Sequence, residues 1–237
     1  MATLAGGTTR DRPFFLRMIV GISAIIVLGF LQFAARGFVN YGTAPLWVHL
    51  HGVVMLAWLG LLICQASLVQ RGNLMLHRQL GVLGVALAAA LVVLGSFTGL
   101  RAIALHRVPP FFTDAFFLAL TQVGVLFFGA MIVAAVANRH RAEWHRRLMI
   151  GALVLLMEPA FGRILPMPFM GGWGEWVIMV IQLGALGIVA RHDRQRFIAV
   201  HPATLASALV VVLAHVAVAL AAMTPFFVNA AARIAAN

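Results

Sequence analysis

The sequence predicts an all-α, polytopic integral membrane protein, a bundle of about seven transmembrane helices. Charged residues make up only 10% of the chain and the mean hydropathy is +1.01, whereas a soluble domain carries about 25% charged residues. Apolar stretches of about 20 residues recur along the chain, each long enough to cross a bilayer core of about 30 Å. They lack the alternation of barrel strands, so their backbone polar groups must be satisfied within helices.

The apolar stretches place the predicted spans in order along a single transmembrane domain, residues 1–237, with lipid as its main solvent. The predicted spans are residues 14–35, 46–69, 80–100, 114–137, 148–165, 173–190 and 202–223.

Short polar loops separate these spans. A basic turn, Arg-Gly-Asn, divides the second span from the third, and we expect Asp114 to cap the fourth. The fifth contains Glu158 followed by Pro159, which lacks the N–H that a continuous helix would use. The stretch PMPFMGGWGEW precedes the sixth, and TPFFVNAAARIAAN after the seventh is expected to be a tail or a short surface helix.

The arginines predict the orientation in the membrane. All seventeen basic residues are arginine, and twelve of them fall on the side of the N-terminus. Cytoplasmic loops are enriched in positive residues, so we expect the N-terminus inside and the C-terminus outside. Arginine in place of lysine is typical of a G+C-rich bacterial genome, which favours a bacterial inner (cytoplasmic) membrane. The five remaining arginines are Arg36, Arg101, Arg107, Arg163 and Arg233.

Composition also excludes some function classes. The net charge of +11 would suit nucleic acid, but the arginines lie in short loops between spans, and membrane orientation explains them without nucleic acid. A seven-helix protein without lysine offers no Schiff base for retinal. No HExxH, Walker, GxSxG, CxxC or dinucleotide motif occurs, which leaves enzymatic and non-enzymatic functions open.

Two histidines, His77 and His145, make the first candidate site. Each follows a short basic turn, one in L-H-R-Q-L-G and the other in W-H-R-R-L, and each lies at the cytoplasmic start of a predicted span. Two histidines at one membrane level are suited to axial ligation of a b-type haem. The alternative is that they are ordinary interface residues at helix ends.

The residues near this pair fit the same hypothesis. Gly81 and Gly84 lie one and two turns beyond the first histidine and predict a smooth face against which a flat macrocycle can lie. Arg78 and Arg146 are placed to pair with haem propionates, as is Arg147. Small residues also promote plain helix packing, so the glycines alone do not decide between the two interpretations.

The second span carries a polar stripe. His51, Trp58 and Gln65 recur at helical spacing and are expected to face the bundle. His215 in the seventh span lies about 21 Å along the helix axis from its cytoplasmic start, so we expect it near the outer leaflet and within reach of His51. The alternative is an interhelical hydrogen bond.

Glu158 lies near the middle of the fifth predicted span. A charge at that depth costs a few kcal/mol unless it is paired or neutralised, and Pro159 frees the carbonyl of Leu155. A kinked helix with a carboxyl group beside it is suited to proton transfer or to quinone binding. Arg163 follows five residues later, a spacing that does not align it with the carboxyl group.

The string HLHGVVMLAWLGLLICQASLVQ…LHRQLG resembles a group of bacterial multi-pass membrane proteins of unassigned function with H-x-H-G, W, Q and H-R-x-L-G in these positions. A more distant resemblance is to the ascorbate-reducible dihaem cytochrome b family, in which histidines on four consecutive helices bind two haems. It implies that His51, His77 and His145 match three of the four ligand positions. At the fourth, Thr113 and Asp114 replace histidine, so the resemblance implies the inner haem more strongly than the outer.

The leading hypothesis is therefore a membrane b-type haem protein that transfers electrons, with a quinone or another electron carrier as partner. A second hypothesis is a non-enzymatic accessory or assembly subunit whose polar residues hold the bundle together. A third is a proton-coupled transporter of small molecules that uses Glu158.

Overall fold

The computed structural model describes residues 12–236, which fold into helices and contain no strand. The elements are α1 (Arg12–Ala35), η2 (Tyr41–Thr43), α2 (Leu46–Gln70), α3 (Leu74–Ala104), α4 (Asp114–Ala137), α5 (Ala142–Leu155), α6 (Glu158–Ile164), α7 (Met167–Met170), η3 (Gly171–Trp173), α8 (Gly174–Arg196), α9 (Pro202–Ala222) and α10 (Pro225–Ala235).

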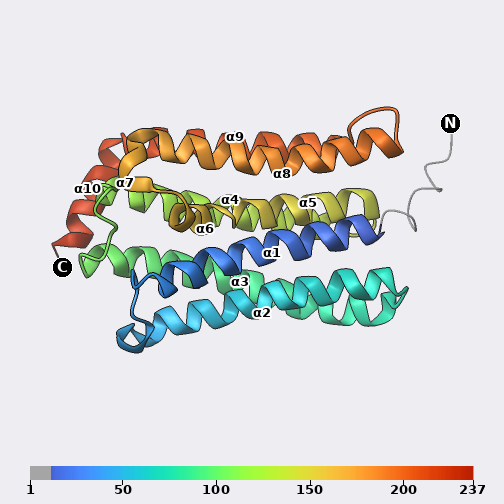
Figure 1. Cartoon of the computed structure of the whole chain (residues 1–237), viewed down its shortest axis with the longest axis horizontal. Coiled ribbons are helices and arrows are strands. Elements are labelled where there is room, and N and C mark those ends of the chain that lie inside the picture. The colour runs from blue at the N-terminus through green and yellow to red at the C-terminus, as the bar shows by residue number, and fades with distance from the viewer. Residues whose placement is uncertain (1–11, 237) are drawn as a thin grey trace.

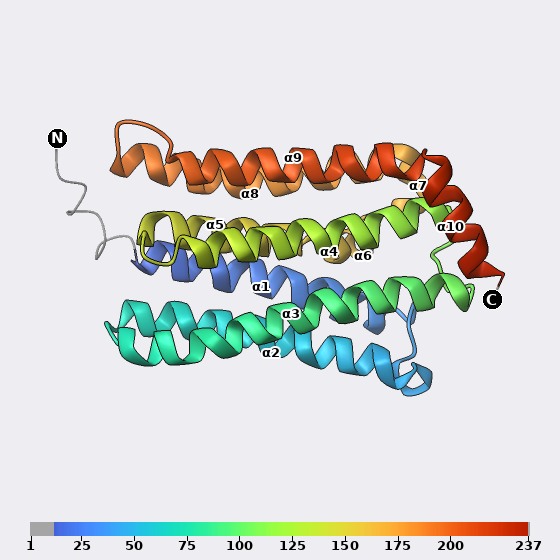
Figure 2. The same ribbon diagram turned by 180° about the vertical axis from the view of Figure 1, so that it is seen from behind.

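The long helices run side by side in alternating directions along one axis (Figures 1 and 2). The pair α8 and α9 packs on one side of α4 and α5, while α2 and α3 lie on the other side, with α1 against α2, α5 and α6. The helix α1 begins at one end of the bundle, and α10 lies across the opposite end over α3 and α4. The described chain thus starts and finishes at opposite ends.

The structure confirms the all-α, multi-pass membrane class. Six helical stretches of the described chain are long and apolar enough to cross a membrane: α1, α2, α3, α4, residues 167–196 and α9. Large apolar side chains are exposed along their outer faces, including Leu28, Val93 and Leu126 at 59–66% exposure. Such surfaces are expected where lipid rather than water surrounds the protein.

The fifth predicted span is the one that differs. Residues 148–165 are not a single helix. The helix α5 ends at Leu155, two residues follow that belong to neither helix, and α6 begins at Glu158. Pro159 has no N–H to donate to the Leu155 carbonyl, and the chain between them makes a tighter turn, in which the Met157 N–H donates to the Val154 carbonyl at 3.0 Å. The two helices together still carry the chain from one end of the bundle toward the other (Figure 1).

Local capping explains where other helices begin. Gly72, at φ +79°, makes the turn after α2 that L side chains rarely adopt, and the side chain of Asn73 then accepts the Leu76 N–H at the start of α3. Thr113, rather than the expected Asp114, caps α4 by accepting from the Phe116 N–H at 3.1 Å.

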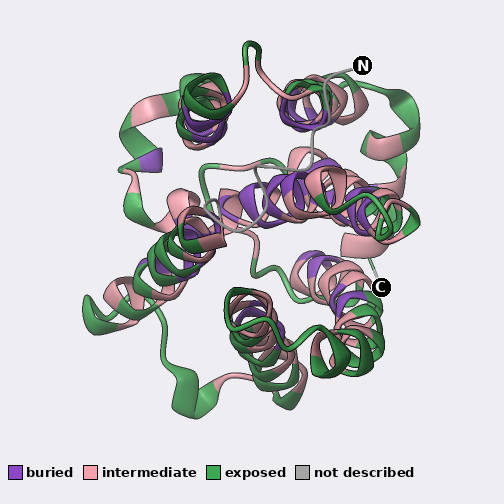
Figure 3. Ribbon diagram, turned by 90° about the vertical axis from the view of Figure 1, so that its right-hand side faces the viewer, coloured by how far each residue is buried: buried purple, intermediate pink, exposed green. Residues whose placement is uncertain are grey.

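The core runs through the middle row of helices, where buried residues gather and face inward (Figure 3). Trp58 of α2 is 2% exposed and meets Phe128 of α4 edge to face at 5.4 Å. Ile150 and Leu153 of α5 are fully buried. Because α5 lies at the centre, its polar residues are held among several neighbouring helices.

Candidate functional site

His77 and His145 lie together at one end of the bundle. His77 is in the first turn of α3 and His145 in the first turn of α5, and both helices begin at the end where α1 starts (Figure 1). Their ring centroids are 6.4 Å apart and their planes cross at 80°. Both side chains are half-buried. The structure thus brings into contact two histidines that are far apart in the sequence.

A backbone carbonyl determines the protonation of the His145 ring. Nδ1 of His145 lies 2.8 Å from the Ala135 carbonyl of α4. A carbonyl only accepts hydrogen bonds, so Nδ1 carries a proton, and Nε2 has the lone pair when the ring is neutral. This is the arrangement found in histidines that bind metals through Nε2.

The His77 ring has a nitrogen that the protein leaves unpaired. The ring of His77 has a hydrogen bond to the backbone of Gln65, whereas its Nδ1 is buried without a hydrogen-bond partner. Most buried polar side-chain atoms in native proteins have a partner. An unpartnered imidazole nitrogen beside a second imidazole therefore marks this pair as a candidate ligand site.

The glycine face of α3 packs against α2. A Cβ atom on Gly81 would lie 3.9 Å from Nε2 of Gln65, and one on Gly84 would lie 3.7 Å from Cδ2 of Leu61. The predicted smooth face exists, but α2 covers it. The two glycines therefore allow close packing of α2 and α3.

An apolar cavity of about 280 Å³ lies instead between α3 and α4. Val85, on its α3 side, lies eight residues beyond His77, about 12 Å along the helix axis, and neither His77 nor His145 lines the cavity. The α4 segment on the other side includes the turn whose Ala135 carbonyl holds His145. The lining residues are Val85, Ile132, Val133, Val136, Ala137 and Arg139.

Two of the three arginines that were expected to pair with haem propionates, Arg146 and Arg147, instead pair with carboxylates of the protein. Arg146 is paired with Glu143 in the same helix, and its guanidinium lies 4.2 Å from the centre of the Phe15 ring. Arg147 points to the other side of α5, toward α8 and α9. Arg78 is exposed at the start of α3, so it is the arginine of this group that faces the surroundings.

Arg147 is the centre of a buried cluster that the sequence analysis missed. Its Nε donates to Oδ1 of Asp193 at 3.0 Å, its Nη2 donates to the same oxygen at 2.5 Å, and its Nη1 donates to Oε2 of Glu143 at 2.5 Å. Thr204 donates its hydroxyl to Oδ2 of Asp193 at 2.6 Å, and the His201 N–H donates to the same oxygen at 3.2 Å. We call Arg147, Glu143, Asp193 and Thr204 the arginine cluster.

The polar stripe on α2 faces the bundle. Trp58 is buried, and Gln65 and His51 are half-buried. His51 faces α3, since its Cε1 would lie 3.8 Å from a Cβ atom on Gly95. Nδ1 of His51 and Oε1 of Gln65 are buried without a hydrogen-bond partner.

His215 pairs with residues of α8 and not with His51. Its Nδ1 is 2.6 Å from Oε1 of Glu175, and its Nε2 is 3.0 Å from Oε1 of Gln182. All three side chains are at most 6% exposed. Glu175 and Gln182 did not enter the sequence analysis. Their seven-residue spacing, which places both on one helix face, is the signal that could have identified them.

The broken helix faces this second group. Gln182 donates its Nε2 to the Leu155 carbonyl at 3.5 Å, which is the carbonyl that Pro159 was expected to free. Glu158 is half-buried in the first turn of α6. Arg163 makes no ion pair with it; instead, it donates to the Pro159 carbonyl at 2.7 Å and lies 4.3 Å from the centre of the Phe30 ring.

Comparisons of the chain with protein-family models, with curated proteins and with solved structures gave no match.

Proposed function

We propose that the protein is a b-type haem protein of a bacterial inner membrane that transfers electrons, with His77 and His145 as the two axial ligands. The observation that carries the proposal is the contact of the two rings, at 6.4 Å between centroids. His77 and His145 would hold the haem iron through their ring nitrogens.

The hydrogen bonds of the two rings support this role. The Ala135 carbonyl holds the proton of His145 on Nδ1, which leaves Nε2 free to bind a metal. Partners of this kind orient ligating histidines and raise their basicity.

Haem fits the donor set better than a bare metal ion. Among residues 12–236, no group of three or more His, Cys, Asp or Glu side chains is placed to hold a metal, and structural metal sites usually require four ligands. A porphyrin would bring its own four nitrogens and need only the two axial histidines. An apolar cavity of about 280 Å³ lies between α3 and α4, but neither histidine lines it, so the fit of haem rests on the two histidines alone.

We propose one haem and not two. Within the described residues, His77 and His145 are the only two histidine rings in contact, and His51 has no such counterpart. When bound, haem b would supply one-electron chemistry, and the two histidines would hold it and tune its potential. A lipid-soluble quinone is the electron partner that this location in the membrane favours.

The test is the visible absorption spectrum of the full chain, purified from haem-supplied cells. We expect a Soret band, and we expect His77→Ala and His145→Ala each to abolish or strongly reduce it. His140→Ala, at an exposed histidine of the same end of the bundle, is the matched control and should keep the band. A colourless wild-type protein, or variants that keep the full band, would rule the proposal out.

The group around His215 favours a second candidate, proton-coupled transport of a small molecule. Glu175, His215 and Gln182 form a continuous buried chain that reaches the break between α5 and α6, and polar groups at membrane depth often carry protons. Transport predicts a proton-coupled flux in vesicles that Glu158→Gln abolishes. A colourless protein without such flux would instead favour a non-enzymatic accessory or assembly subunit.

A further inference from the structure

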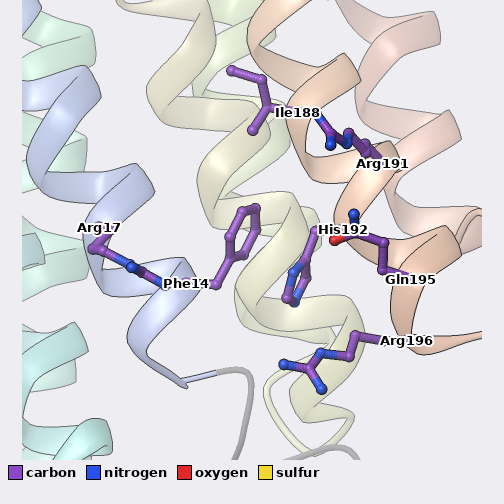
Figure 4. Close-up of a pocket in the computed structure, with 7 residues that line it drawn as sticks. All are labelled: Phe14, Arg17, Ile188, Arg191, His192, Gln195 and Arg196. Atoms are coloured by element: carbon purple, nitrogen blue, oxygen red, sulfur yellow. The ribbon is translucent and has the colours of Figure 1, made fainter.

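A basic cavity of about 370 Å³ lies between α1 and α8, at the end of the bundle where α1 begins. Figure 4 shows Phe14 and Arg17 on α1 at one side of it and the α8 residues from Ile188 to Arg196 at the other. The helix α5 contacts both α1 and α8. The lining residues are Phe14, Arg17, Ile188, Arg191, His192, Gln195 and Arg196.

Arginine is the commonest residue type around this cavity. Three of its seven lining residues are arginines, and because Arg196 and His192 make interactions with other groups, the anion-binding role falls to Arg17 and Arg191. The acidic residue nearest in sequence, Asp193, is fully buried on the other side of α8, where Arg147 already pairs with it. Arg17 and Arg191 therefore bring two guanidinium groups to the cavity, and guanidinium groups recognise phosphate through paired N–H donors.

The inner wall of the cavity is apolar. The ring of His192 stacks on Phe14, with centroids 3.7 Å apart and planes within 6°. Ile188, one turn deeper along α8, is 54% exposed. The cavity is thus polar at the bundle end and apolar toward the middle of the membrane-spanning part.

The apolar character continues along the α8 side. Val180, Gly184 and Ile188 recur at four-residue spacing and share a helix face with Arg191. Val180 is 62% exposed, and a Cβ atom on Gly184 would meet nothing within 4 Å. This face of α8 is therefore an exposed apolar strip, and Arg191 lies at its end nearest the end of the bundle.

The α1 side repeats the pattern. Gly21, Ile25 and Leu28 follow Arg17 at helical spacing on one face. Leu28 is 59% exposed, and a Cβ atom on Gly21 would also meet nothing within 4 Å. Both walls of the cavity therefore combine an arginine at the bundle end with an exposed apolar strip along the span.

We propose that this cavity binds the headgroup phosphate of an anionic phospholipid, with the acyl chains along the apolar strips of α1 and α8. Basic pockets between membrane helices are suited to anionic headgroups. A free phosphate ion shares the headgroup chemistry, but it would gain nothing from the apolar strips. The proposal goes beyond electron transfer and holds whether or not the protein binds haem.

The test is equilibrium binding of labelled phosphatidylglycerol to the full chain in an uncharged detergent. Phosphatidylcholine with the same acyl chains and label is the neutral probe. The double variant Arg17→Gln/Arg191→Gln should weaken phosphatidylglycerol binding about tenfold or more. The matched control, Arg71→Gln/Arg194→Gln, removes two exposed arginines that do not line the cavity and should change the affinity little.

Two further measurements separate the lipid from a free ion. Gly184→Leu should weaken lipid binding by filling the apolar strip, and millimolar inorganic phosphate should not displace the lipid. Displacement by phosphate, together with no effect of Gly184→Leu, would replace the lipid site with a site for a free anion. Equal binding of the two lipids, or an equal loss in the control variant, would overturn the proposal.

Discussion

Two polar clusters at the same end of the bundle share helix α5 but differ in how completely their hydrogen bonds are made. In the arginine cluster, the guanidinium of Arg147 donates from all three of its nitrogens and both carboxylate oxygens of Asp193 accept. In the histidine pair, Nδ1 of His77 is buried and unpartnered. The hydrogen bonds of the arginine cluster are therefore those expected of a cluster that stabilises the fold, whereas the proposed ligand pair contains a buried nitrogen without a partner.

Removal of the buried guanidinium of Arg147 is expected to have the largest effect on stability. Arg147 and Asp193 have side chains at most 1% exposed, so Arg147→Leu would leave a buried carboxylate without its partner. We expect the free energy of unfolding to fall by about 3–5 kcal/mol. Equilibrium unfolding in mixed detergent micelles measures it.

Two further variants check the cause of that loss. Arg146→Leu, at the half-buried neighbour that pairs with Glu143, should cost about 1 kcal/mol or less. The double variant Arg147→Leu/Asp193→Leu should recover much of the stability, because it removes both charges. A small loss in Arg147→Leu alone would contradict the structural role of the cluster.

The histidine pair should behave in the opposite way. Without haem, His145→Ala should change the free energy of unfolding by about 1 kcal/mol or less. With haem at 100 times its dissociation constant, the wild-type protein should gain about 2.7 kcal/mol. Thermal unfolding with and without added haem measures both. An equal gain in His145→Ala would show that the added haem binds elsewhere.

A smaller effect than that of Arg147→Leu is expected at the edge of the arginine cluster. Thr204→Val keeps the side-chain shape and removes the hydroxyl that donates to Asp193 at 2.6 Å. Loss of a hydrogen bond to a charged group should lower the free energy of unfolding by about 1.5–3 kcal/mol at most, and by less here because the His201 N–H still reaches the same oxygen. Ser207→Ala, whose hydroxyl donates to a carbonyl of its own helix, is the control and should cost less.

The fold class followed from the sequence because hydropathy is a property of whole segments. The alternation of long apolar runs and short basic loops predicted the multi-pass helical architecture, which the structure confirms. The break in the fifth span, in contrast, depends on a few individual backbone hydrogen bonds. Pro159 and the Leu155 carbonyl signalled a kink, but the distance over which the chain leaves the helix depends on packing that only the structure contains.

The part of the candidate site that consists of two histidines in similar sequence motifs could be predicted from the sequence. His77 and His145 were matched by their shared H-R sequence and their place at helix starts. The arginine cluster joins three helices through unlike residues, so no local pattern contains it. The helical period along α8 was nevertheless present in the sequence. Glu175, Gln182 and Asp193 are spaced at whole turns of one face, and that face is buried against α9.

The smallest predicted effect is the pH dependence of His201, which lies in the loop before α9. Burial, and then the positive charge of Arg147, lower the pKa of this histidine from its ordinary value of 6.5, although Asp193 and Glu143 oppose the shift. The neutral ring accepts the Ala203 N–H at Nδ1, at 3.1 Å, and so caps the helix. A protonated ring cannot accept this bond.

The sign follows from proton binding. Below pH 6.5 the unfolded chain takes up a proton at His201 more readily than the folded chain does, so stability falls as the pH falls. Above pH 6.5 the contribution is complete. His201→Asn keeps a side chain that can cap the helix but does not titrate, so its unfolding midpoint should fall less than that of the wild type between pH 7 and pH 5. If the unfolding midpoints of the two proteins changed with pH in parallel, His201 would not be the group whose titration lowers the stability.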